Sequence, residues 1–352
     1  MVDRQQLFSG VTRVTDDAPF ERAKLQAYLQ QQVAGFSGEL DIYKFNGGPS
    51  NPTYLLEAGG RRYVLRSKPP GALVHGGHAV DREYRVLTAL AETPVPVAGT
   101  HCLCRDESVI GTWFYVMDHV DGRLLWNPAL PDAEPRQRAA VYDAMNRVIA
   151  ALHAVDYRAV GLADFGKPDG YLQRQIERWS QQYFDASPQP LAAMREVSDW
   201  LAAHRPAHSD NALIHGDYKL ENLILAHDRD DIAAVLDWEL STLGDPLADF
   251  SYHCMWWHLP PEPFNGLQGL DCAALGIPTE QEYIDNYCRR TGRDGIPHWN
   301  FYMAFNLFRR AAIIEGVVHR ARQGNAASTQ APKLAALIEP LAQRAREVAA
   351  AG

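Results

Sequence analysis

The first third of the chain combines short apolar runs with two helical patterns. Leu25, Leu29 and Val33 recur at the spacing of one helix face, which predicts a helix over 20–33. Gly59-Gly60 is a typical hairpin turn between two strands. A second helix is predicted over 79–91. The apolar runs predict five strands, over 39–45, 53–58, 62–66, 100–104 and 113–117.

The rest of the chain has mainly helical spacing. Only the region 213–237 interrupts this pattern with strands. The predicted helices cover residues 136–153, 170–184, 189–203, 279–290, 299–322 and 332–350. A strand-rich part followed by a helix-rich part predicts an α+β fold of two lobes.

Two short motifs in this interrupting region carry the candidate chemistry. The first, HGDYKLEN, separates Asp217 from Asn222 by five positions, and the second, VLDWE, ends a short apolar run on Asp237. Apolar runs on both sides of residues 227–231 predict a hairpin that sets Asn222 directly opposite Asp237. Phosphoryl transfer from a nucleoside triphosphate needs one carboxylate to orient the acceptor hydroxyl, and an amide with a second carboxylate to hold magnesium. The alternative is a hairpin decorated with turn-forming Asp and Asn.

The motifs resemble those of the aminoglycoside phosphotransferase-like branch of the protein-kinase fold, in which His-Gly-Asp replaces the His-Arg-Asp of protein kinases. More narrowly, the chain resembles the kinase-like module that some eukaryotes carry fused to an acyl-CoA dehydrogenase, and that bacteria often encode separately. The segments that carry this narrower resemblance are SNPTY (50–54), YVLR (63–66), DREYR (81–85), YVM (115–117), HGDYKLEN (215–222) and DWELSTLGDP (237–246).

The resemblance implies a protein-kinase-like fold of two lobes. The expected N-lobe covers residues 1–118, with an N-terminal helix, a small antiparallel five-stranded sheet and one further helix. A hinge over 119–122 follows. The expected C-lobe, residues 123–352, is larger, mostly helical, and holds the catalytic loop and the acceptor pocket.

Each residue of the motifs receives an expected role. Asp217 is expected to be the catalytic base that orients the acceptor. Lys219 could reach the transferring phosphate, although an exposed loop lysine is the alternative. Asn222 and Asp237 are expected to bind magnesium, which prefers hard oxygen ligands. The residues expected to support the site, by binding backbone groups or by capping, are His215, Asp245 and Asp249.

The N-lobe is expected to cover ATP. Protein kinases place a lysine on the third strand, where this sequence has Arg66. An arginine can pair with phosphate or with the helix residue Glu83, whose alternative is a solvated helix charge. The loop expected to approach the phosphates, unless it is an ordinary turn, contains Gly47, Gly48, Ser50 and Asn51. The segment whose backbone the resemblance implies for adenine binding is Met117, Asp118, His119 and Val120.

The acceptor site is expected among aromatic and basic residues of the C-lobe. The predicted helix over 299–322 carries four arginines against a single acid, Glu315. A polycationic aminoglycoside would call for acidic residues here, so the balance favours an anionic acceptor with an apolar part, such as a hydroxyacyl-CoA. A solvated helix face and a packed core are the alternatives. The candidate substrate residues are Trp256, Trp257, Arg309 and Arg310.

Composition limits the expected binding partners and cellular location of the protein. The net charge of −9 argues against nucleic acid or an anionic membrane as the main partner. No apolar run approaches the roughly 20 residues that span a bilayer. The first residues show no signal-peptide pattern, and five scattered cysteines fit a reducing compartment, so we expect a cytoplasmic protein.

The leading hypothesis is an ATP- and magnesium-dependent kinase that phosphorylates a hydroxyl of a small metabolite. Because Arg66 replaces the usual lysine, one alternative is a nucleotide-binding regulatory or scaffold protein that partners an acyl-CoA dehydrogenase. An antibiotic-modifying kinase of the aminoglycoside type is the other alternative.

Overall fold

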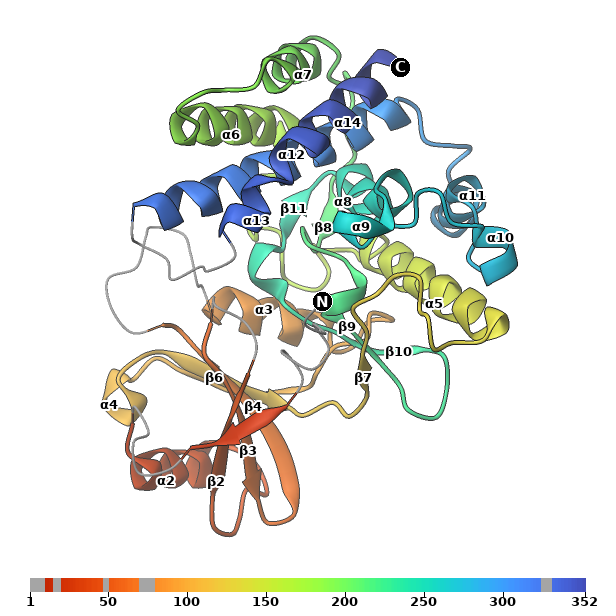
Figure 1. The fold of residues 1–352 in the computed structure, drawn as a ribbon. Coiled ribbons are helices and arrows are strands. Elements are labelled where there is room, and N and C mark those ends of the chain that lie inside the picture. Colours follow the sequence, from red (N-terminus) through yellow and green to blue (C-terminus); the bar gives the residue numbers. More distant parts are fainter. Residues whose placement is uncertain (1–9, 15–19, 47–50, 70–79, 324–330) are drawn as a thin grey trace. The chain divides into compact units, whose positions relative to one another are not determined.

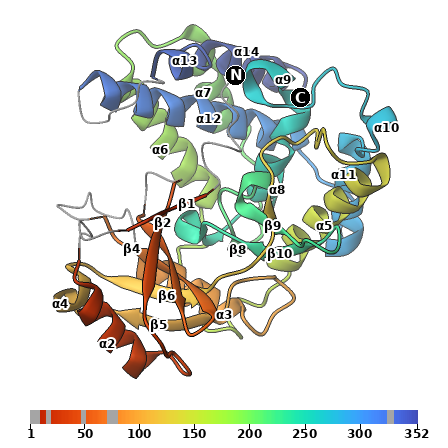
Figure 2. The same ribbon diagram turned by 60° about the horizontal axis from the view of Figure 1, so that its bottom comes forward.

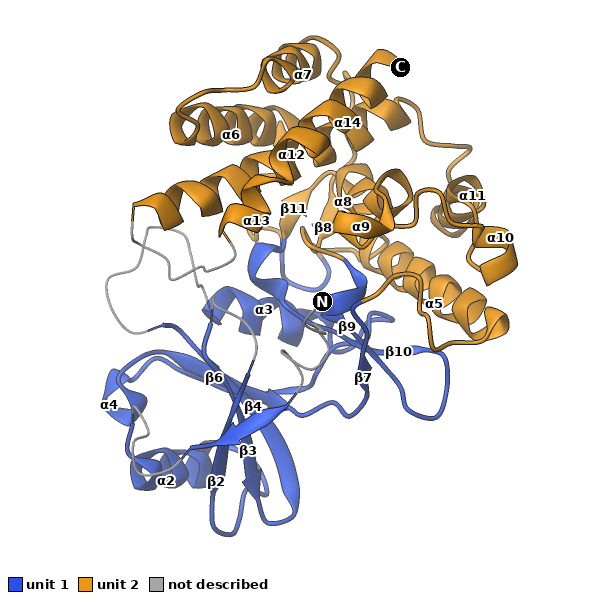
Figure 3. Cartoon of the chain, in the orientation of Figure 1, with its two compact units in different colours: residues 1–126, 159–162, 219–241 blue, residues 127–158, 163–218, 242–352 orange. Residues whose placement is uncertain are grey.

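The computed structural model describes residues 10–14, 20–46, 51–69, 80–323 and 331–352. The chain forms two compact units (Figure 3). Unit 1 contains residues 1–126, 159–162 and 219–241, and unit 2 contains residues 127–158, 163–218 and 242–352. This division assigns residues 219–241 to the unit that holds the N-terminal part of the chain. The lobe boundaries at 118 and 122 stay a prediction.

Unit 1 is built on an antiparallel sheet (Figure 1). Among the described residues this sheet has six strands in the order β1-β2-β3-β4-β6-β5, one more than predicted. The sequence does not predict β1, because its three residues are all exposed and show no buried face. The strands are β1 (Val11–Arg13), β2 (Asp41–Phe45), β3 (Thr53–Ala58), β4 (Arg61–Ser67), β5 (Thr100–Cys104) and β6 (Phe114–Asp118).

The turn between β3 and β4 confirms the predicted hairpin at Gly59-Gly60. The two glycines have φ angles of 57° and 76°, in the left-handed region that glycine adopts without steric cost. The hairpin sets the register of β4, so that Arg66 lies between Thr53 on β3 and Tyr115 on β6. This pairing places Arg66 on a central strand of the sheet.

Helices cover the sheet of unit 1. α2 (Arg22–Gln32) lies over one face (Figure 2), and its Leu25 and Leu29 form a core with Leu56 and Leu65. All four leucines are fully buried, and burial of each stabilises the unit by about 1.5–3 kcal/mol. The short helix α4 (Glu107–Ile110) adds to the same core. α3 (Val80–Leu90) packs against β5 and β6 and carries the buried Glu83.

A second, three-stranded sheet in unit 1 holds the residues around the second motif. Its order is β10-β9-β7, with β7 (Arg123–Leu124), β9 (Leu223–Leu225) and β10 (Ile232–Val235). Gly122 precedes β7, and a Cβ atom there would lie 2.2 Å from a methyl carbon of Ile224. Glycine therefore allows the chain after β6 to pass close to the strand that follows Asn222.

Unit 2 is mostly helical. Its long helix α12 (Trp299–Arg322) packs against α6, α7, α8 and α14 and has the bounds that the sequence predicts (Figure 1). A two-stranded sheet pairs β8 (Ala212–Ile214) with β11 (Thr242–Gly244). The other helices are α5 (Pro135–His153), α6 (Tyr171–Ala186), α7 (Ala192–Ala203), α8 (Pro246–Cys254), α9 (Pro261–Phe264), α10 (Cys272–Leu275), α11 (Glu280–Thr291), α13 (Ala331–Ala335) and α14 (Ile338–Ala350).

The fold is α+β, as predicted. The part of the chain that the structure describes contains no helix with the length and apolar character needed to cross a membrane.

Candidate active site

The His-Gly-Asp loop begins where β8 ends, in unit 2. His215 is fully buried, and its Nδ1 accepts a hydrogen bond from the backbone N–H of Asp217 at 3.2 Å. Gly216 has a φ of 83°, which a residue with a Cβ atom rarely adopts. The short strand β8 and this glycine turn the chain so that Asp217 is half-buried.

Asp249 anchors the loop from α8. Its carboxylate accepts the backbone N–H groups of His215 and Gly216, each at 2.8 Å, and it contacts His153 Nε2 at 3.2 Å. Burial alone would raise the pKa of Asp249, but the hydrogen bond and charge of His153, together with His215, hold that pKa below its ordinary value. The buried carboxylate therefore stays charged and binds the loop backbone in the manner expected of a supporting residue.

Asp245 supports the same helix at its start. It caps α8 by accepting the backbone N–H groups of Leu247 and Ala248, at 2.8 and 3.1 Å. Ser209 and Tyr302 donate their hydroxyls to its other oxygen. Burial raises the pKa of Asp245, and these hydrogen bonds oppose the increase. The helix that carries Asp249 is thus fixed at its N-terminus.

Two further residues of unit 2 contact the loop. The hydroxyl of Tyr252 donates to Asp217 Oδ1 at 2.5 Å, and Arg309 donates to the carbonyl oxygen of Gly216 at 2.8 Å. Sequence reasoning missed Tyr252. Its position, three residues after Asp249 and therefore on the same side of α8, is the signal that could have identified it.

The second motif lies in unit 1, where the predicted pairing of Asn222 with Asp237 is wrong by one residue. Leu236, not Asp237, donates its backbone N–H to the carbonyl of Asn222, at 2.8 Å. Leu225 pairs with Ile232, which centres the turn one residue earlier than predicted. An irregularity between residues 232 and 234 shifts the register back only partly.

Asp237 therefore lies just beyond the paired strands. Its backbone is left-handed, with a φ of 62°, and its side chain is 31% exposed. Oδ1 of Asp237 accepts a hydrogen bond from the guanidinium of Arg66 at 2.6 Å. The carboxylate of Asp237 and the amide of the buried Asn222 are hard oxygen donors of the kind that magnesium prefers, so both residues fit a magnesium site.

Arg66 joins Asp237 to Glu83 within unit 1. Its Nε lies 2.8 Å from Glu83 Oε2, and Glu239 lies farther away, at 3.8 Å. Burial alone would lower the pKa of Arg66, but the carboxylates, Glu83 first, raise it. The side chain predicted to contact nucleotide thus bridges two acidic residues, one on α3 and one after β10.

Glu83 is nearly inaccessible, with 1% of its surface exposed. Asn51 donates to Oε1 at 2.8 Å and Tyr115 donates to Oε2 at 3.1 Å. Burial raises the pKa of Glu83, and the positive charge of Arg66 opposes this increase. Among the predicted site residues, Asn51, Arg66, Glu83 and Asp237 therefore form one connected network.

The roles of Lys219 and of the remaining residues predicted to contact nucleotide stay predictions. Lys219 is half-buried and lies 3.8 Å from Glu221, an ion-pair distance. The backbone N–H groups of Asp118 and His119 donate to the carbonyls of Gly99 and Arg62. Adenine recognition by this segment would therefore rely on other backbone groups. The predicted residues that lie outside the described part of the chain are Gly47, Gly48 and Ser50.

Of the four candidate acceptor residues in unit 2, Trp256 and Arg309 are buried, and Trp257 and Arg310 are half-buried. Arg309 is only 6% exposed, so the alternative of a solvated helix face is excluded at this position. Helix α12 is buried around most of its circumference over residues 301–309, which leaves this arginine no open side. Arg310 lies over the ring of Trp256, and Trp257 donates its indole N–H to Pro278.

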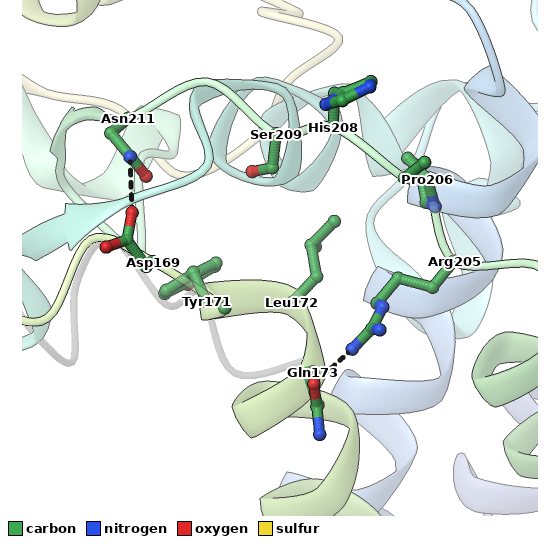
Figure 4. Close-up of a pocket in the computed structure, with 11 residues that line it drawn as sticks. Asp169, Tyr171, Leu172, Gln173, Arg205, Pro206, His208, Ser209 and Asn211 are labelled. Carbon is green, nitrogen blue, oxygen red and sulfur yellow. Dashed lines mark hydrogen bonds between the residues drawn. The ribbon is translucent and has the colours of Figure 1, made fainter.

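A pocket of about 280 Å³ lies at the start of α6 (Figure 4). Residues 169–173, 205–209 and 211 line it, and hydrogen bonds join Asn211 to Asp169 and Arg205 to Gln173. None of the predicted site residues that the structure describes lines this pocket. The candidate chemistry therefore lies elsewhere in the chain.

Known proteins resemble the chain over most of its length. The mouse acyl-CoA dehydrogenase family member 10 is 42% identical over 92% of the chain, and the human family member 11 is 38% identical over 95%. The chain spans 31% and 44% of the length of these two relatives. The kinase-like resemblance to a module associated with acyl-CoA dehydrogenases is thereby confirmed.

Solved structures confirm the predicted protein-kinase-like fold. A candidate aminoglycoside phosphotransferase from Ralstonia eutropha JMP134 is 49% identical, with a TM-score of 0.88, and the match covers 94% of this chain and 98% of that one. Choline kinase from Cryptosporidium parvum Iowa II is 11% identical, with a TM-score of 0.65, over 93% and 96% of the two chains, and so shares the fold.

The profile of the phosphotransferase enzyme family matches residues 41–284, which include every predicted catalytic, metal and nucleotide residue. The chain belongs to the phosphotransferase enzyme family.

Proposed function

We propose that this phosphotransferase is an ATP- and magnesium-dependent kinase that transfers the γ-phosphate to a hydroxyl of a small metabolite. The observation that carries the proposal is the anchored loop at Asp217. Buried Asp249 fixes the two residues before Asp217 by their backbone N–H groups, so the half-buried carboxylate has a set position. Asn222 and Asp237 follow at the spacing that phosphoryl transfer needs.

Asp217 is the proposed acceptor-orienting base. Its carboxylate accepts a hydrogen bond from the acceptor hydroxyl and takes the proton as the hydroxyl oxygen bonds to the γ-phosphorus. The bond from that phosphorus to the bridging oxygen of ADP breaks, and ADP leaves with the electron pair. The anchored loop contributes by positioning, which together with electrostatic stabilisation supplies almost all of the catalysis in this reaction class.

Asn222 and Asp237 are the proposed magnesium ligands. Bound magnesium would neutralise charge on the phosphate oxygens. Asp237 shares its carboxylate with Arg66, and Arg66 is held in turn by Glu83, so the orientation of the metal ligand depends on this buried pair. Lys219 is proposed to contact the transferring phosphate as a point charge.

The nucleotide is proposed to bind to unit 1. Gly47, Gly48, Ser50 and Asn51 would approach the phosphates, and the 117–120 segment would contact adenine. Asn51 supports this proposal because it donates to Glu83 and so joins the end of the glycine-rich segment to the Arg66 network.

The acceptor is proposed to be a hydroxyacyl-CoA or a related anionic metabolite, and the protein is proposed to be cytoplasmic and functionally linked to an acyl-CoA dehydrogenase. The names of the relatives support the link. Arg309 does not support an anionic acceptor, because its guanidinium already donates to the carbonyl oxygen of Gly216 in the loop. Arg320, at the end of α12, is exposed and could attract an anion, whereas the exposed Arg322 already pairs with Glu315 at 3.2 Å.

The proposal is tested by incubating the purified protein with γ-labelled ATP, magnesium and a panel of acyl-CoAs, sugar alcohols, choline-like amines and aminoglycosides. Transfer to a hydroxyacyl-CoA supports the full proposal. Transfer to an aminoglycoside instead makes the protein an antibiotic kinase.

A regulatory nucleotide-binding protein is the second candidate function. Arg66 occupies the position at which protein kinases have a lysine, and it forms an ion pair with Asp237. Magnesium-dependent nucleotide binding without transfer to any acceptor, and without release of phosphate, would favour this candidate over the kinase.

A further inference from the structure

Helix α8 contacts the His-Gly-Asp loop through two residues. Asp249 binds the backbone before Asp217, and Tyr252, three residues later, reaches the carboxylate itself. The distance of 2.5 Å from the Tyr252 hydroxyl to Asp217 Oδ1 is that of a charge-assisted O–H···O hydrogen bond, which is shorter and stronger than a neutral one.

Arg309 fixes the ring of Tyr252. Its guanidinium lies over this ring, 5.1 Å from the centroid, and over the ring of Trp179 on α6, at 5.6 Å. The same guanidinium donates to the carbonyl oxygen of Gly216. A buried cation between two aromatic rings is stabilised by the ring faces. The orientation of Tyr252 is therefore set by residues from α6 and α12 and by the loop backbone.

We propose that Tyr252 is a positioning residue that sets the rotation of the Asp217 carboxylate. The rotation of a carboxylate about its last side-chain bond is soft, since this torsion has broad minima. A hydrogen bond to Oδ1 fixes this rotation and hence the direction in which Oδ2 points. The inference rests on the proposed role of Asp217 as the acceptor-orienting base, and it explains why a tyrosine hydroxyl is held against that carboxylate.

Tyr252→Phe removes only the hydroxyl and keeps the ring beneath Arg309. The probe is release of phosphate from ATP with magnesium, with water as the acceptor, and transfer to any acceptor found in the panel. Loss of a hydrogen bond to a charged group should lower kcat by about ten- to a hundredfold. Affinity for a non-hydrolysable ATP analogue should change less than about twofold, because the hydroxyl acts after the nucleotide is bound.

Tyr142→Phe is the matched control. Tyr142 is also buried in unit 2, and its hydroxyl donates to a carbonyl, that of Pro128, at 2.7 Å, without contacting Asp217. Its removal should leave kcat unchanged. Equal kcat for wild type and Tyr252→Phe, or an equal loss in both Tyr→Phe variants, would overturn the inference.

A double variant separates positioning from a general structural effect. If Tyr252 acts through Asp217, adding Tyr252→Phe to Asp217→Asn lowers turnover no further than Asp217→Asn alone. Independent effects that multiply would overturn the inference. Wild-type turnover in Asp217→Asn would instead overturn the proposed function, because the base itself would then be misassigned.

Discussion

Replacement of Arg66 by methionine tests the buried ion pair that connects α3 to Asp237. The side chains of Arg66 and Glu83 are 14% and 2% exposed. Methionine keeps an apolar stem but removes the cation, so Glu83 remains buried without its counter-charge. Removal of one partner of such a pair costs about 3–5 kcal/mol, which corresponds to a decrease of about 6–20 °C in the melting temperature of a unit of this size.

The loss of stability in Arg66→Met should depend on pH in a defined direction. Burial already raises the pKa of Glu83, and without the opposing charge of Arg66 this pKa rises further. The folded state then binds the Glu83 proton more tightly than the unfolded chain does. Stability is therefore retained below the unfolded pKa, about 4.3, and is lost as pH rises through the folded pKa. The deficit of Arg66→Met relative to wild type should be larger at pH 8 than at pH 5.

Thermal unfolding followed by circular dichroism at the two pH values measures both effects. The double variant Arg66→Met with Glu83→Gln should recover part of the loss, because a neutral pair leaves no buried charge. Arg62→Met is the matched control on the same strand. Arg62 and its partner Asp121 are 45% and 62% exposed, so its removal should cost less than about 1 kcal/mol. Equal melting of wild type and Arg66→Met at both pH values, or a larger deficit at pH 5, would refute the reasoning.

Two further variants test the metal site and the loop anchor. Asp237→Ala should weaken magnesium-dependent binding of an ATP analogue at least about tenfold in calorimetric titrations, and unchanged affinity with and without magnesium would exclude Asp237 as a metal ligand. Asp249→Asn should destabilise the protein by about 3 kcal/mol at pH 7, because charge-assisted hydrogen bonds are lost. The pKa of Asp249 is held low in the folded protein, so the stability that its charge provides is present above the unfolded pKa and is lost as pH falls. Chemical denaturation of wild type and Asp249→Asn at pH 7 and pH 3 measures this dependence. A difference in unfolding free energy that is as large at pH 3 as at pH 7 would contradict the assignment.

The sequence predicts those features that local chemistry determines. The Gly59-Gly60 turn and the length of α12 both follow from residue type and spacing. The register around Asn222 does not, because the turn is centred one residue earlier than the apolar runs indicate and the irregularity after Ile232 compensates only partly. One residue of register changes which side chain comes opposite Asn222.

Where the spacing of apolar residues does not show which side of a helix is buried, tertiary packing determines it. Helix α12 is apolar around most of its N-terminal half, so no periodicity shows whether Arg309 faces solvent or the interior. Its buried position becomes clear only from its contacts with Gly216 and Tyr252. The role of Tyr252 likewise depends on how α8 packs beside the loop, although its spacing from Asp249 is visible in the sequence.

Turnover of Asp217→Asn is the most direct test of the proposed kinase mechanism. Asparagine keeps the shape of the side chain but cannot take the proton of the acceptor hydroxyl. Transfer of the γ-phosphate from ATP in the presence of magnesium should fall on the order of 10³-fold or more, while ATP-analogue affinity changes little. Asp210→Asn, at an exposed carboxylate that pairs with the half-buried Arg293 in the same unit, is the matched control and should retain activity. Wild-type turnover by Asp217→Asn would contradict the account.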